Sequence, residues 1–122
     1  MSENIDELLE DPDSHEQRVF PRREVKWKAA IKDKQTEQII PAATINVSKH
    51  GVLLETEVCF KKLQKLPVMI KVIYGSNKLV IYATAEVRHV VIRKKDFHLG
   101  LQFVEIDTKS QTFLAKFADR AI

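Results

Sequence analysis

Three arginines gather in one short segment of the sequence, where they could bind an anion. Residues 17–23 read Gln-Arg-Val-Phe-Pro-Arg-Arg and place Arg18, Arg22 and Arg23 within six residues. A guanidinium group offers paired, planar donors that suit phosphate oxygens and the acceptor edge of guanine. Most runs of positive charge contact only water, so this arginine segment also fits a solvated basic linker.

A second polar segment lies further along the chain, between two apolar runs. Residues 46–51 read Asn-Val-Ser-Lys-His-Gly, and we refer to them as the polar turn. Asn46 and Ser48 are residues that hydrogen-bond to the backbone of a turn, and Gly51 tolerates a positive φ angle. An ordinary turn therefore explains these residues without a function. Each segment alone leaves a structural and a functional interpretation open.

The sequence contains no motif typical of an enzyme. It lacks a P-loop, a dinucleotide fingerprint, a nucleophile elbow and a His-Glu-x-x-His run. Ser48 and His50 lie two residues apart, but no third group is available to orient them as a catalytic triad requires. The lone Cys59 cannot form an internal disulfide and has no partners at metal-ligand spacing. We therefore expect a non-enzymatic protein without a bound cofactor or metal.

The net charge of +3 is unevenly distributed. Residues 1–16 contain seven acidic side chains and no lysine or arginine, so the remainder has 20 basic residues against 17 − 7 = 10 acidic ones. A body this basic attracts a nucleic acid, a nucleotide, an anionic membrane or an acidic protein. Charge alone does not choose among these partners, and a surface that merely keeps the protein soluble is an equal alternative.

Most of the chain alternates apolar and polar residues with period two, which predicts strands. Runs of this kind cover residues 24–32, 39–47, 51–57, 67–74, 77–92 and 97–106. Tight hairpins are expected at Gly75-Ser76 and at residues 93–96. About six strands without intervening helices favour an antiparallel barrel or sandwich. The fold class is therefore all-β with a terminal helix.

The two ends of the chain differ from this pattern. Residues 1–14 are expected to form a tail and residues 15–122 a single domain. After Asp107 or Thr108, either of which could cap a helix, apolar residues recur at helical spacing. These residues are Phe113, Leu114, Phe117, Ala118 and Ala121. No run approaches the roughly 20 apolar residues of a membrane-spanning helix, and the first residues lack a secretory signal, so we expect no membrane insertion and a cytoplasmic location.

The order of the two polar segments resembles that of PilZ domains. In that family an Arg-x-x-x-Arg motif, here Arg18 and Arg22, precedes an Asn-x-Ser-x-x-Gly motif and an apolar strand. Residues 51–54, 85–88 and 100–103 also resemble strands of the family, so that the resemblance covers about residues 16–122. It implies a bacterial protein with a six-stranded antiparallel β-barrel and a C-terminal α-helix. The implied ligand is the second messenger cyclic di-GMP.

The resemblance also implies roles for individual residues. Arg18 and Arg22 would fold over the ligand and contact its phosphates and guanine N7 and O6, with Arg23 as a further phosphate contact. Asn46 and Ser48 would meet the opposite edge of a guanine, and the absence of a side chain at Gly51 would permit a close approach. Two further predicted ligand-binding residues lie in the matching strands: Arg88 and Gly100.

Two departures from the family pattern refine these expectations. Gln17 replaces an arginine that many members carry, which favours one bound ligand over a stacked pair. Asn46 replaces the commoner aspartate and lacks its two charged acceptors. We expect a receptor that changes its surface on binding cyclic di-GMP and signals to an effector protein. The alternatives are an adaptor of the same family that binds no nucleotide and, least favoured because Trp27 and most phenylalanines fall on core faces, an RNA-binding barrel.

Overall fold

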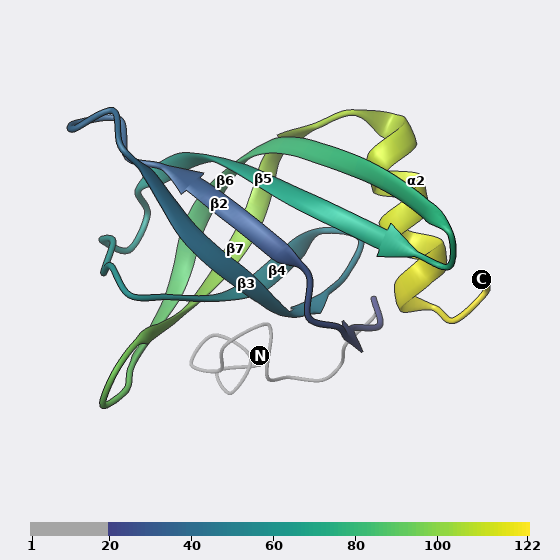
Figure 1. Cartoon of the computed structure of the whole chain (residues 1–122), viewed down its shortest axis with the longest axis horizontal. Coiled ribbons are helices and arrows are strands. Elements are labelled where there is room, and N and C mark those ends of the chain that lie inside the picture. Colours follow the sequence, from purple (N-terminus) through teal and green to yellow (C-terminus); the bar gives the residue numbers. More distant parts are fainter. Residues whose placement is uncertain (1–19) are drawn as a thin grey trace, which may run out of the picture.

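The computed structural model describes residues 20–122, which form seven strands and one helix (Figure 1). The elements, in chain order, are β1 (Arg23–Glu24), β2 (Lys28–Lys32), β3 (Ile39–Val47), β4 (Gly51–Thr56), β5 (Lys65–Tyr74), β6 (Asn77–Ile92), β7 (Phe97–Ile106) and α2 (Thr108–Ala118). The tail expected over residues 1–14 lies outside the described residues. Within the described residues, no helix is long and apolar enough to cross a membrane.

The strands form one closed antiparallel barrel. Their order is β1-β3-β2-β5-β6-β7-β4, and a further pairing between β3 and β4 closes the sheet on itself. Strands β2 to β7 therefore make a six-stranded barrel, while β1 is an additional short strand paired with β3. This confirms the six-stranded antiparallel β-barrel and decides between the barrel and the sandwich that the strand pattern had left open.

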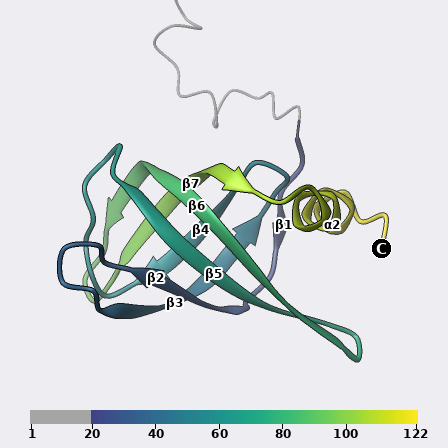
Figure 2. The ribbon, with the colours of Figure 1, turned by 90° about the horizontal axis from the view of Figure 1, so that it is seen from above.

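Local sequence explains the hairpins. Strands β5 and β6 pair from Lys65 with Glu86 to Tyr74 with Asn77, which leaves Gly75 and Ser76 as a two-residue loop. Gly75 has a φ angle of 62°, and a positive φ at the first loop position is what a primed turn requires. Figure 2 shows this hairpin extending beyond the barrel on the side of α2. The predicted hairpin at residues 93–96 is also confirmed, since the Arg93 N–H donates to the Asp96 carbonyl at 2.9 Å.

The interior of the barrel is filled by the inward-facing residues of every long strand. The largest fully buried side chains of the strands are Ile31, Leu54, Leu66, Ile70, Ile81 and Leu99, and Leu114 of the terminal helix is fully buried as well. The alternation predicted for the last strand is confirmed, since Leu99 and Leu101 are buried and Phe97 and Phe103 pack against the core. Trp27 is also buried, as expected from its place in the first apolar run.

The first predicted strand, residues 24–32, is divided into β1 and β2, and Thr44 provides the reason. The buried Thr44 hydroxyl accepts a hydrogen bond from the Trp27 N–H at 2.8 Å and donates one to the Val25 carbonyl at 2.5 Å. The Thr44 side chain is therefore the acceptor for the Trp27 N–H, although the Thr44 N–H still donates to the Trp27 carbonyl at 2.9 Å and the Val25 N–H to the Ile45 carbonyl at 3.1 Å. Strand β3 has a register shift here, between Thr44 and Asn46. The expectation of one continuous strand was wrong, because the period-two pattern of residues 24–32 does not show that the Thr44 hydroxyl of β3 bonds to this segment.

Helix α2 covers one end of the barrel (Figures 1 and 2). Asp107 caps its start by accepting from the Ser110 N–H at 2.9 Å. Leu114, Phe117 and Ala118 are buried as predicted. Ala121 was expected on the same face, but the helix ends at Ala118 and Ala121 is exposed. The chain leaves the helical path there because Arg120 adopts a left-handed φ of 58°.

Candidate functional site

The polar turn connects β3 to β4 and is held by its own hydrogen bonds. The Ser48 N–H donates to the Gly51 carbonyl at 2.9 Å, and the Gly51 N–H donates to the Ser48 hydroxyl at 3.2 Å. The His50 carbonyl accepts from the Phe103 N–H at 2.8 Å, which ties the turn to β7. Gln111 of α2 donates to the Lys49 carbonyl at 3.0 Å. The turn is therefore a fixed part of the barrel surface with Ser48 half-buried within it.

Gly51 is required by close packing of two strands. A Cβ atom added to this residue would lie 2.3 Å from the Leu101 carbonyl oxygen. This oxygen belongs to the backbone of β7 and cannot move aside as a flexible side chain could. Gly51 pairs with Gln102 of β7, so the clash would fall directly on the β4–β7 ladder. The close approach at Gly51 in this structure is thus between the polar turn and β7.

Asn46 and Gly100 belong to one row across the outer face of the barrel. Asn46 pairs with Leu53, Leu53 with Gly100, and Gly100 with His89. A Cβ atom at Gly100 would lie 3.1 Å from the His89 ring, so the glycine leaves space for the imidazole to lie against β7. The barrel thus places Asn46 of β3 in the same row as Gly100 of β7, although the two residues are far apart in the sequence.

Arg88 projects from β6, beside this row. Its guanidinium group donates to the Gln102 side chain and lies 3.9 Å from the Glu86 carboxylate. Both partners are themselves on the barrel surface, so that Arg88 remains accessible. Its charge is partly balanced by Glu86, which reduces its attraction for an anion compared with an unpaired arginine.

The arginine segment reaches the polar turn through an aromatic contact. Phe20 packs edge-to-face on His50 with ring centroids 4.3 Å apart, and the Lys49 amine lies 5.4 Å from the Phe20 ring centre. Arg22 follows on the exposed approach to β1, whereas Arg18 lies outside the described residues. Sequence reasoning did not identify Phe20, Lys49 and His50 as site residues. The sequence signal that could have identified these three residues is their position inside the arginine segment and the polar turn.

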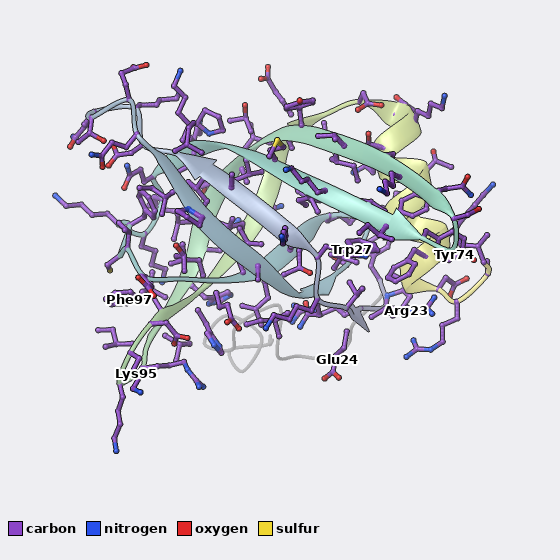
Figure 3. All side chains as sticks on the ribbon, viewed as in Figure 1. Arg23, Glu24, Trp27, Tyr74, Lys95 and Phe97 are labelled. Atoms are coloured by element: carbon purple, nitrogen blue, oxygen red, sulfur yellow. The ribbon has the colours of Figure 1, made fainter. Side chains whose placement is uncertain are left out.

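Arg23 points to the C-terminal helix and away from the polar turn. Its guanidinium group donates to the carbonyls of Phe117 at 3.1 Å and Ile122 at 3.3 Å, and lies 4.1 Å from the centre of the Phe117 ring. Figure 3 shows Arg23 on the helix side together with Trp27 and Tyr74, while Glu24 points outward. The next residue along, Glu24, pairs with Asn46. The two-residue strand β1 therefore joins the arginine segment, a predicted ligand-binding residue and α2.

Among residues 20–122, one group of potential metal ligands lies away from the polar turn. Ligand atoms of Glu55, Asp96 and His98 all lie within 4.8 Å of one another. Asp96 is already engaged, since its carboxylate accepts from Arg93 at 3.0 Å. We assign no metal site to this group, because surface acidic clusters of this kind are common without an ion.

The barrel, its short extra strand and its terminal helix define the class to which the molecule belongs. The chain is a member of the PilZ domain family, whose model matches residues 16–120. No curated protein matches the sequence. The family expected from the two motifs is thereby confirmed.

Solved structures share the fold at low sequence identity. The chain is similar to the inhibitor of motility MotI/DgrA from Bacillus subtilis, with a TM-score of 0.77 at 20% identity over 88% of this chain and 52% of that one. It is similar to YcgR from Escherichia coli in complex with c-di-GMP, with a TM-score of 0.71 at 11% identity over 87% and 46% of the two chains. It also resembles the isolated PilZ domain of YcgR with c-di-GMP, with a TM-score of 0.67 at 13% identity over 87% and 94%. The chain thus spans about half the length of the first two proteins.

Proposed function

We propose that this PilZ protein is a non-enzymatic receptor for cyclic di-GMP that binds the nucleotide between the arginine segment and the polar turn. The observation that carries the proposal is the contact of Phe20 with His50, which brings the two motifs together at one place on the barrel. The two PilZ structures of YcgR with c-di-GMP bound support this ligand class. Because Gln17 stands where a further arginine is common, one ligand molecule is the expected stoichiometry.

The site offers complementary chemistry for such a ligand. Cyclic di-GMP carries two phosphate charges, and the exposed Arg22 can supply paired donors to a phosphate or to guanine. Asn46, at the end of β3, offers an amide that can both donate and accept at a base edge. Lys49 adds a second positive charge at the polar turn. Arg18 is proposed to close over the ligand from the preceding part of the arginine segment.

Arg23 connects this site to the surface around α2. In this structure Arg23 holds the end of α2 through two carbonyls and the Phe117 ring. A ligand bound between the arginine segment and the polar turn would shift β1 and thereby alter this contact. We propose that the altered surface around α2 is what a cytoplasmic effector protein recognises. In this role Arg23 transmits binding instead of contacting phosphate.

Titration of amide NMR spectra with cyclic di-GMP tests the proposal, because it reports binding, stoichiometry and the residues affected. Saturable shifts are expected around the polar turn and β1. Replacing Arg22 with Ala should weaken binding roughly 10- to 100-fold, the range for a lost hydrogen bond to a charged group. The matched control is Arg93→Ala on the far hairpin, which should leave the affinity unchanged.

Ser48 separates the receptor from the adaptor that binds no nucleotide. Its hydroxyl accepts from the Gly51 N–H, so a purely structural role in the turn is already accounted for. Ser48→Ala should weaken binding, because the receptor proposal places this hydroxyl at a guanine edge, whereas an unchanged affinity would limit Ser48 to its role in the turn. Ser76→Ala in the other turn is its control. Absence of any saturable shift with the intact protein would reject the receptor and leave the adaptor as the function.

A further inference from the structure

The outer face of β5 and β6 exposes apolar and basic side chains in alternation. We define the β5–β6 face by the outward residues in the half of these strands nearer their hairpin: Met69, Lys71, Ile73, Lys78, Val80 and Tyr82. Cross-strand pairing places Met69 opposite Tyr82, Lys71 opposite Val80 and Ile73 opposite Lys78. Every pair contains an apolar residue, and two of the three also contain a lysine.

The apolar members of this face are well exposed. Tyr82 is 68% exposed, Ile73 59% and Val80 43%. Large apolar side chains gathered on one part of a soluble protein are typical of an interaction surface. This face lies on the strands opposite the polar turn in the sheet order, because β2 separates β5 from β3 and β7 separates β6 from β4. The PilZ ligand site therefore does not account for it.

Positive charge on the β5–β6 face is uncompensated. The acidic side chain on the outward side of β5 and β6 is Glu86, which lies beyond this face and beside Arg88. Within residues 20–122 no ion pair involves Lys71 or Lys78. The neighbouring strand β2 adds the exposed Lys28 two residues before Ala30, which pairs with Met69. A second copy docked symmetrically on this face would bring lysines against lysines, which is unfavourable. The partner that fits is an acidic segment with apolar side chains.

The same chain contains a segment with this chemistry. Residues 1–16 carry seven acidic side chains and no lysine or arginine, and Ile5, Leu8 and Leu9 are interspersed among them. Phe20, where the described chain begins, lies twelve positions after Leu8, and this length of chain can span about 40 Å when extended. A domain of about 100 residues has a radius of gyration of roughly 13 Å, so the reach is sufficient.

We propose that residues 1–16 dock on the β5–β6 face of their own chain. The leucines and Ile5 cover Tyr82, Ile73 and Val80, while the carboxylates pair with Lys71 and Lys78. Because exposed ion pairs are screened by salt, the contact weakens as ionic strength rises. This interaction is independent of nucleotide binding and would shield an apolar surface until an acidic partner competes for it.

Paramagnetic relaxation in the full-length chain tests the contact. The exposed Cys59 is replaced by Ser, and a spin label is attached through Ser2→Cys. Amide signals of Lys71, Val80 and Tyr82 should broaden, and the broadening should decrease at high salt. The double variant Lys71→Glu/Lys78→Glu should abolish it, whereas Lys94→Glu/Lys95→Glu at the tip of the β6–β7 hairpin should leave it unchanged.

Three results would overturn the proposal. Broadening centred on Lys49 and His50 would show that the acidic segment contacts the polar turn instead. Absence of localised broadening at low salt would show no docking at all. Broadening that persists when spin-labelled, unenriched protein is mixed with isotope-enriched protein lacking the label would show binding between chains, contrary to docking within one chain.

Discussion

Replacing Gly51 with alanine should destabilise the barrel more than any other single methyl addition at a described glycine. The new Cβ would lie 2.3 Å from the Leu101 carbonyl oxygen, and this distance must open to about 3.0 Å before it becomes tolerable. Backbone lies on both sides, so no side-chain rotation can relieve the clash. Strands β4 and β7 must separate at the pair formed by Gly51 and Gln102. Overpacking of this kind costs about 3 kcal/mol.

The matched control is Gly75→Ala, which adds the same methyl group at a place with no atom within 4 Å. Its only cost is a left-handed φ of 62°, roughly 1–2 kcal/mol for an L-residue. Urea unfolding followed by circular dichroism measures both free energies. An unfolding free energy for Gly51→Ala equal to or above that of Gly75→Ala would refute the packing argument. The variant should also bind cyclic di-GMP more weakly, because the displaced strand carries the polar turn.

Three further predictions concern side chains that hold the fold together. Arg23→Ala should lower the free energy of unfolding by about 1–2 kcal/mol, since two hydrogen bonds to helix carbonyls and the contact with Phe117 are lost; an unchanged urea midpoint would contradict this. Thr44→Val should cost about 1–3 kcal/mol because the Trp27 N–H loses its buried partner, and a denaturant midpoint equal to that of the wild type would show that water replaces the hydroxyl. Hydrogen bonds from Ser110 lower the pKa of Asp107, so its stabilising effect is present at neutral pH and is lost as the pH falls through the lowered folded value. Asp107→Asn should therefore flatten the acid limb of the stability profile below about pH 4, and a limb of unchanged slope would assign it to other carboxylates.

The contacts of β1 explain why the fold and the candidate site are difficult to separate by mutation. Its two residues pair with Val47 and Asn46, and Arg23 reaches the end of α2. A change at Arg23 can therefore alter ligand affinity through the position of Asn46 as well as through the charge of the arginine segment. Stability and affinity should accordingly be measured together for variants in this strand.

Local sequence was sufficient for the family to which the chain belongs and for its elements, except the division of the first strand and the end of the helix. Alternation of apolar and polar residues along each strand indicates which face is buried. Gly75-Ser76 predicts a tight hairpin, and Asp107 caps the helix through contacts within one turn. The two motifs were recognisable because their residue types and order are properties of the chain. None of these inferences depends on which strands become neighbours in space.

Tertiary structure alone decided the rest, because the decisive partners are distant in the sequence. Thr44 of β3 hydrogen-bonds to Val25 and Trp27, between β1 and β2, where the first predicted strand is divided, and pairing between β3 and β4 closes the barrel. Arg23 has the same charge and nearly the same sequence position as Arg22, yet it points to carbonyls about a hundred residues away. Phe20 meets His50 only because β1 lies beside the end of β3. Alternation specifies which way a side chain faces, whereas its partner is determined by how the closed sheet and the helix are packed.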